Sequence, residues 1–122
     1  MAIERRDDEG LGVVFFSVSG TLGLEDLREA LSRFYATRPP GLPRNYLWDF
    51  RKAEVDWSSD EIRGFAAWVG ANRQPGEGKT AVVVATDFHF GLARMYEVFS
   101  SDYPVEFVVF RDLEAATAWV TR

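Results

Sequence analysis

Residues 49–60, DFRKAEVDWSSD, connect a strand-like segment to the start of a helix, and they decide how the rest of the chain is interpreted. They follow on from an apolar segment, residues 46–50, which is typical of a buried strand. A short loop then leads to Ser58 and Ser59, and hydroxyl side chains are common at the start of a helix. A strand, a loop and a helix start in this order indicate an α/β domain, which often places its site at such a junction.

The residues before this stretch predict a hairpin and a helix. Residues 3–7 and 12–19 have strand-like patterns and are separated by the turn sequence Asp-Glu-Gly, which predicts an antiparallel pair. Residues 24–36, LEDLREALSRFYA, have apolar side chains at steps of three and four and acidic side chains in the first turn. This pattern predicts an amphipathic helix.

Helices and strands alternate in the residues that follow. Residues 79–85, KTAVVVA, are apolar without alternation, which predicts a central strand covered on both faces. Residues 105–110 predict the last strand, and Asp112 is expected to cap a closing helix that runs through Trp119. The second helix has an apolar stripe at Ile62, Phe65, Ala66 and Val69. The third helix, capped by Thr86 and Asp87, is expected to turn to the core Phe88, Leu92, Met95 and Phe99.

These elements predict one α/β domain over residues 1–122, because a chain of this length has enough apolar residues for a single core. The predicted fold has one mixed, mostly parallel five-stranded sheet, with an N-terminal β-hairpin followed by alternating helices and strands, and four helices. If consecutive strands are neighbours, right-handed crossovers place the connecting helices on one face. The other face then needs a cover, and a homodimer is one hypothesis for it.

Composition and charge argue against several classes of function. The chain has no cysteine, so it can form no disulfide, thiolate nucleophile or cysteine metal site. A net charge of −5 without a basic stripe argues against nucleic-acid binding. Its apolar runs are far shorter than the roughly 20 residues of a membrane span, and residues 1–10 lack the apolar core of a secretion signal. We expect a cytoplasmic protein without a metal or cofactor.

The residues around the two serines have a complete structural explanation. Ser58 and Glu61 have the spacing of a capping box, in which the serine oxygen accepts a first-turn N–H and the glutamate accepts the N–H of the cap. Trp57 and Ile62 stand where a hydrophobic staple would join them. One interpretation of the stretch is therefore that it serves the fold alone.

The element order and this stretch also resemble the STAS domain, the fold of bacterial anti-sigma-factor antagonists. In that family a strand ends in Asp, and a helix opens with Asp-Ser-Ser-Gly after a loop of fixed length. Asp49, Ser58 and Ser59 match these positions without a gap, and the resemblance places the family's phosphorylatable serine at Ser59. The segments GLARMYEVF and FRDLEAATAWV are also similar to uncharacterised bacterial STAS-like proteins.

Two positions depart from the family pattern, since Trp57 replaces its Asp and Asp60 replaces its Gly. Asp60 removes the room that a glycine gives to an approaching kinase, and it would repel a phosphate on Ser59, as would Asp56 and Glu61. The resemblance implies a non-enzymatic regulatory or protein-interaction module with a protein partner and a phosphoswitch that is lost or altered. The candidate phosphoacceptor and partner-contact residues are Ser59, Ser58, Asp49, Trp57 and Asp60.

Aromatic residues are more numerous than one small core needs, with ten Phe, four Trp and four Tyr. Trp68 and Tyr96 fall off the apolar stripes of their helices, which indicates the edge of the core, an interface or the wall of an apolar pocket. The CRAL-TRIO proteins, which resemble this architecture, bind lipids, so a small apolar-ligand or lipid-binding protein is the alternative function. The candidate interface or pocket residues are Trp68, Phe90, Tyr96 and His89.

Catalytic motifs are weak in this sequence. His89 is the only histidine, and it has neither a nucleophile elbow nor patterned ligand partners. Such a histidine is typically a partly exposed surface residue. Gly78-Lys79-Thr80 resembles the end of a phosphate-binding loop, but Arg73 stands where that loop needs its first glycine. We therefore expect no enzymatic activity.

Overall fold

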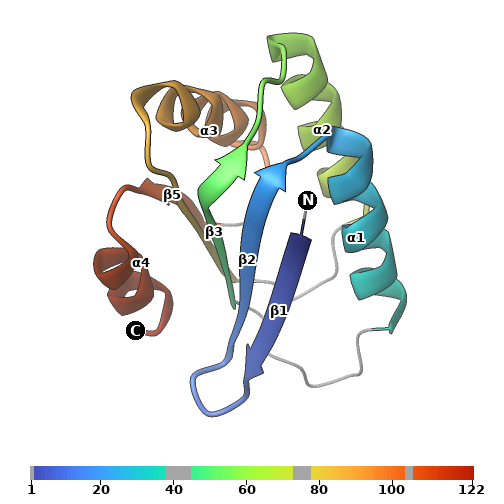
Figure 1. The fold of residues 1–122 in the computed structure, drawn as a ribbon. Helices are drawn as coiled ribbons and strands as arrows, with labels where there is room; N and C mark the ends of the chain where they lie inside the picture. The colour runs from blue at the N-terminus through green and yellow to red at the C-terminus, as the bar shows by residue number, and fades with distance from the viewer. Residues whose placement is uncertain (1, 38–44, 73–77, 104–105) are drawn as a thin grey trace.

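The computed structural model describes residues 2–37, 45–72, 78–103 and 106–122. Within this part of the chain, five strands and four helices follow one another as the sequence predicts (Figure 1). They are β1 (Ala2–Asp8), β2 (Val13–Thr21), α1 (Leu24–Thr37), β3 (Asn45–Glu54), α2 (Ser59–Asn72), β4 (Lys79–Val83), α3 (Asp87–Phe99), β5 (Glu106–Phe110) and α4 (Leu113–Val120). Arg73, and residue 105 at the predicted start of the last strand, lie outside the described residues.

Every strand of the sheet lies beside its neighbour in sequence, in the order β1-β2-β3-β4-β5. β1 is antiparallel to β2, and the other three pairs are parallel. This confirms the mixed, mostly parallel sheet with an N-terminal hairpin. The hairpin turn ends at Gly12, whose φ of 69° is favoured by glycine because it has no Cβ.

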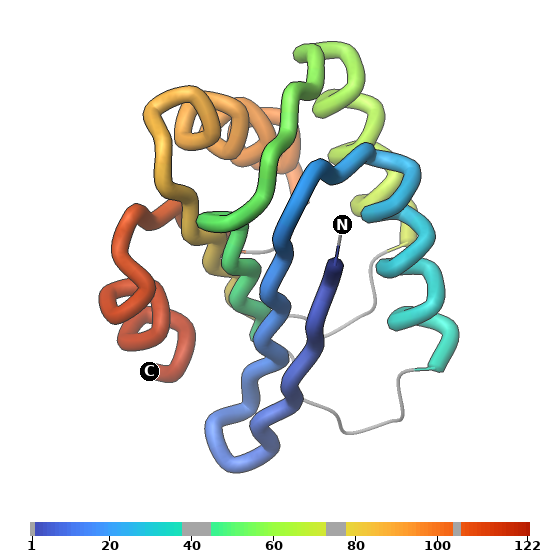
Figure 2. The backbone as a smooth tube through the Cα atoms, viewed as in Figure 1, coloured from blue at the N-terminus to red at the C-terminus, as the bar shows by residue number. Residues whose placement is uncertain are grey.

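The connecting helices α1, α2 and α3 pack on one face of the sheet, and α4 packs on the other (Figure 2). The first three link parallel strands through right-handed crossovers, so they share a face as expected. No strand follows α4, so no crossover fixes its side, and it covers β3, β4 and β5 on the second face. On the second face, the sequence suggested a homodimer as the cover. Over β3, β4 and β5 this cover is α4 of the same chain.

The predicted apolar stripes of the first two helices are confirmed. The buried residues of α2 are Ile62, Phe65, Ala66 and Val69. Those of α1 are Leu24, Leu27, Leu31 and Phe34. None of the described helices has the length and apolar character that a membrane crossing requires.

The predicted core stripe of α3 is rotated by one residue from the observed one. Phe88 is 55% exposed, whereas His89 is buried at 7%. The cavity-lining residues His89, Ala93, Tyr96 and Ser100 have the same steps of four, three and four, and Leu92 of the predicted stripe also lines the cavity. A shift of one residue turns a helix by about 100°. Because α3 is apolar around most of its circumference, periodicity alone allows both orientations, and packing against α2 and β5 selects one of them.

Candidate functional site

The capping box predicted at the start of α2 is present. The backbone N–H of Ser58 donates to Oε1 of Glu61 at 3.0 Å, and the N–H of Glu61 donates to Oγ of Ser58 at 3.1 Å. Ser59 is the first residue of the helix, and both serines are exposed. The hydroxyl of Ser58 is therefore used by the fold, whereas Ser59 lies beside it at the surface without a part in the cap.

Trp57 anchors the loop that leads to α2. Its Nε1 donates to the backbone oxygen of Leu22 at 3.1 Å, and its ring packs against the core formed with α1, α2 and α3. Trp57 and Ile62, the two residues of the predicted staple, both line a cavity of that core. The indole thus faces inward, and the polar residues of the helix start are the ones that face solvent.

Asp49 does not lie at the end of its strand, so this part of the sequence interpretation is wrong. β3 continues to Glu54 and pairs with β2 as far as Thr21↔Glu54. Only the pairing with β4 stops at Asp49↔Val83. The loop before α2 is correspondingly short, because backbone pairing with β2 keeps residues 50–54 in the sheet.

Arg51 binds the carboxylate of Asp49. Its Nε and Nη2 donate to the two carboxylate oxygens at 2.9 and 2.8 Å, and its backbone N–H donates to Oδ1 at 3.1 Å. Burial opposes ionisation of Asp49, but the hydrogen bonds and the positive charge of Arg51 outweigh it and hold the pKa of Asp49 below its usual value.

Asp49 and the two serines are not brought together. Side chains alternate along a strand, so Asp49 shares the face of Leu47, which packs against α4, and not that of Trp48. No hydrogen bond or ion pair between described residues joins Asp49 to Ser58 or Ser59. The matched spacing in sequence therefore does not form a cluster in space.

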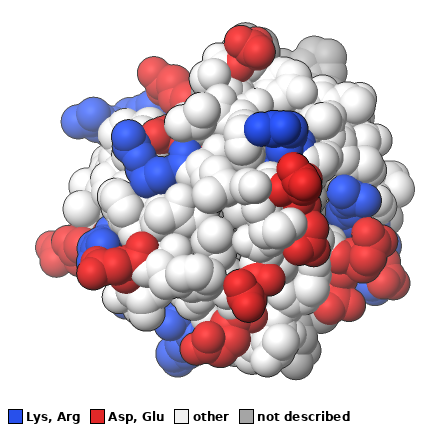
Figure 3. All heavy atoms as spheres, turned by 90° about the horizontal axis from the view of Figure 1, so that it is seen from above, with Lys and Arg blue, Asp and Glu red and all other residues white. Residues whose placement is uncertain are grey.

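Acidic side chains surround the start of α2. Asp56, Asp60 and Glu61 are exposed, and a depression between the starts of α1 and α2 also contains Glu25 and Arg28. Nη1 of Arg28 lies 3.4 Å from Oε1 of Glu25. Figure 3 looks onto this end of the molecule, where acidic and basic side chains are interspersed around uncharged areas. An added phosphate would meet mostly negative charge here.

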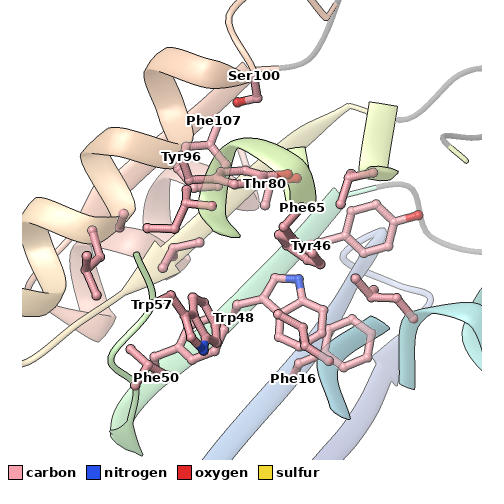
Figure 4. A pocket seen from close by; sticks show the side chains of 18 of the residues that line it. Phe16, Tyr46, Trp48, Phe50, Trp57, Phe65, Thr80, Tyr96, Ser100 and Phe107 are labelled. Atoms are coloured by element: carbon pink, nitrogen blue, oxygen red, sulfur yellow. The ribbon is translucent and has the colours of Figure 1, made fainter. Parts of the chain in front are cut away.

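A cavity of about 140 Å³ lies between the sheet and the helices α1, α2 and α3 (Figure 4). No Asp, Glu, Lys or Arg is among the described residues that line it. Rings from the sheet stack along one wall, with centroids 4.0 Å apart for Phe16 and Trp48 and 5.8 Å apart for Trp48 and Phe50. Other aromatic lining residues are Phe34, Trp57, Phe65, Tyr96 and Phe107.

Two of the four candidate pocket residues line this cavity, namely His89 and Tyr96. Trp68 does not, because it stacks behind the wall on Phe65, with ring centroids 6.0 Å apart. Phe90 is not a lining residue either, and its ring centroid lies 4.8 Å from Cζ of the Arg111 guanidinium. Some of the numerous aromatic residues therefore line the cavity, and others, such as Trp68 and Phe90, pack at the edge of the core.

His89 is buried, so the expectation of a partly exposed histidine is wrong. Thr86 caps α3 by accepting the backbone N–H of His89 at 3.1 Å, and His89 lies on the side of the helix that lines the cavity. The imidazole contacts the ring of Phe88, with centroids 5.8 Å apart, and makes no hydrogen bond within the described chain. No carboxylate accompanies it in the cavity lining, so the usual orienting partner of a catalytic base is missing from the described lining.

The strand residues of the cavity were not identified from the sequence, although a signal for them exists. Tyr46, Trp48 and Phe50 alternate on β3 and place three large rings on one face. Their neighbours on β4, Thr80 and Val82, are smaller and leave space in front of these rings. No group of His, Asp and Glu side chains in the described residues is arranged to hold a metal ion.

Comparison with solved structures identifies the class of fold. An uncharacterised protein of the DUF3478 family with a SpoIIAA-like fold, from Shewanella loihica PV-4, is 18% identical and has a TM-score of 0.65, covering 98% of this chain and 92% of that chain. An anti-sigma factor antagonist from Mycobacterium paratuberculosis is 17% identical and has a TM-score of 0.64, covering 99% and 96%. No family model and no curated protein matches the sequence. The chain has a STAS-like fold, as the resemblance in its sequence suggested.

Proposed function

We propose that this protein is a non-enzymatic regulatory or protein-interaction module of the STAS-like type, whose contacts with a protein partner centre on the start of α2. The observation that carries this proposal is the exposed first turn of α2, where Ser59 and Asp60 face solvent beside a cap already satisfied by Ser58 and Glu61. The similar anti-sigma factor antagonist supports a role in protein binding.

A phosphoswitch at Ser59 is lost or altered in this proposal. Asp60 and Glu61 follow Ser59 directly, and phosphate would add close to two negative charges beside them. Arg63, one turn further along α2, has its guanidinium 4.9 Å from the ring centroid of Phe99 and would have to leave it to bind a phosphate. In this proposal, the surface at the start of α2 binds its partner while Ser59 is unphosphorylated.

Charge substitution at Ser59 tests this use of the surface. A partner is purified with the wild-type protein, and its Kd is measured for Ser59→Asp, Ser59→Ala and the control Ser32→Asp, which changes an exposed serine in α1. We expect Ser59→Asp to weaken binding by about tenfold or more, because an unpaired charge in an interface is costly to desolvate. If both Ser59 variants bind like wild type, or if Ser32→Asp weakens binding equally, the proposed surface is wrong.

The second candidate function is binding of a small apolar ligand, and the cavity favours it. Cavities of about 150 Å³ with apolar walls bind molecules the size of benzene. Native mass spectrometry of protein taken directly from cells is expected to show an added small mass. Ala93→Phe should remove it, because Ala93 lines the cavity, whereas Ala67→Phe on the exposed side of α2 should keep it. A spectrum with only the mass of the polypeptide would contradict this candidate.

A further inference from the structure

One polar side chain of the cavity has the features of a ligand-binding group. His89 is 7% exposed, lines the cavity and has no hydrogen-bond partner for its imidazole within the described chain. Its ring nitrogens keep accessible surface, because Arg28 Nε is the one fully buried side-chain polar atom without a partner among the described residues. A ligand in the cavity can therefore supply a hydrogen bond to the imidazole. The imidazole can donate through one nitrogen and accept through the other.

We propose that the cavity binds a small neutral aromatic molecule with a single hydrogen-bonding group, of the phenol or indole class, and that His89 binds this group. The proposal rests on the apolar-ligand function above and adds the chemistry of the ligand. The cavity volume of about 140 Å³ accommodates a single or fused ring.

The walls of the cavity favour an aromatic ligand. Phe16, Trp48 and Phe50 stack in a row on the sheet. The ring of Tyr96 in α3 packs on that of Phe107 in β5, with ring centroids 5.0 Å apart. Aromatic rings attract one another in offset-stacked and edge-to-face arrangements beyond the effect of buried area. A ring bound in this cavity would extend the existing contacts, and an aliphatic ligand would lack this contribution.

The absence of charge from the described lining favours a neutral ligand. No lysine or arginine of that lining could pair with a carboxylate, and His89 is its only titratable group apart from tyrosines. Moving an unpaired carboxylate from water into such a site costs several kcal/mol more than moving a hydroxyl or an indole N–H. A phenol is therefore expected to bind, and benzoate, its anionic analogue, is not.

The hydroxyl of Thr80 is another polar group of the lining, but it lies at the other end of the cavity. It stands near the start of β4, whereas His89 follows the end of that strand. The four steps along the chain from Thr80 to Val84 span about 13 Å, so Thr80 and the end of the strand that leads to His89 lie far apart for one polar group on a single ring. His89 is the more deeply buried of the two and gains more from a partner.

Titration with phenol and toluene tests the proposal, since the two ligands differ by one hydroxyl. In wild-type protein we expect both to bind, and phenol but not toluene to shift the imidazole NMR signals of the sole histidine. His89→Leu should weaken phenol binding by about three- to tenfold, the effect of one hydrogen bond, and leave toluene within about twofold. Val98→Ala, which changes an exposed residue of α3 outside the lining, should leave both ligands unaffected. Thr80→Val tests whether the hydroxyl of Thr80, and not His89, binds the hydroxyl of phenol.

The outcomes separate this inference from the function on which it rests. If neither ligand binds wild-type protein, the apolar-ligand function and the inference both fail. If toluene binds but phenol leaves the imidazole signals unchanged, or if Thr80→Val and not His89→Leu weakens phenol, the assignment of His89 fails and the apolar-ligand function stands. The NMR measurement uses unaltered protein, so the test does not depend on the folding of any variant.

Discussion

Asp49 and Arg51 form a bidentate ion pair on β3 whose contribution to stability depends on pH. Since the pKa of Asp49 is lower in the folded protein than in the unfolded chain, the contribution is complete above the unfolded pKa and is lost as the pH falls through the folded pKa. The pair is partly exposed, so we expect Asp49→Asn to reduce the free energy of unfolding by about 1 kcal/mol or less at pH 7.

The difference between wild type and Asp49→Asn is expected to shrink steadily as the pH is lowered from about 5 to 2.5, since protonated Asp49 also lacks the charge. Urea unfolding at several pH values measures it. Asp102→Asn is a matched control, because the exposed Asp102 has no ion pair or hydrogen bond among the described residues. A difference that grows toward low pH would show that the pair does not act in this way.

At the scale of elements, the start of α2 separates a structural serine from a surface serine. Ser58→Ala removes the oxygen that accepts the N–H of Glu61, and should cost about 1 kcal/mol. Ser59→Ala should be neutral or slightly stabilising, by up to about 0.5 kcal/mol, because alanine is the better helix former. Chemical denaturation of both variants distinguishes these effects. Equal losses at the two positions would mean that the cap does not control the start of this helix.

The packing of α2 against the segment after α3 depends on the small size of Gly70. A Cβ added there would clash with the ring of Tyr103, so this ring would have to move. We expect Gly70→Ala to destabilise the protein by about 1–2 kcal/mol despite the better helix propensity of alanine. Gly64→Ala, in the same helix with only Arg28 Nη2 at 3.9 Å, should stabilise it by about 0.5–1 kcal/mol. Thermal unfolding gives both values, and a stabilising Gly70→Ala would exclude the Tyr103 contact.

Local signals explain which elements could be predicted from the sequence. The caps at Ser58, Thr86 and Asp112 and the stripe of α2 depend on residues within one or two helical turns, and the structure contains all of them. The orientation of α3 and the burial of His89 depend instead on contacts with distant elements, and both predictions failed. The spacing from Asp49 to Ser59, which matches the family pattern, likewise did not determine proximity, because β3 continues in the sheet beyond Asp49.

For the whole molecule, the two faces of the sheet differ because a cavity borders one of them. Three helices cover one face and line the cavity, whereas α4 packs on the other face. Ala116 and Val83 are completely buried there. The run of valines in residues 79–85 indicated a sheet covered on both faces. It did not indicate that a cavity would lie between the sheet and the helices of one face.

Val82 and Val83 are adjacent on β4, and their side chains point to opposite faces, which makes them a direct test of this difference. Val83→Ala opens a new void in a close-packed region and should cost about 2–3 kcal/mol, the transfer of two methyl groups plus a cavity term. Val82→Ala only enlarges a cavity that Val82 already lines, so fewer contacts are lost and we expect a cost of about 1–1.5 kcal/mol. Urea unfolding of the two variants in one buffer gives the comparison, with m-values checked for equality. A loss at Val82 as large as that at Val83 would mean that the first face is as closely packed as the second in solution, and the volume assigned to a ligand would then not be available.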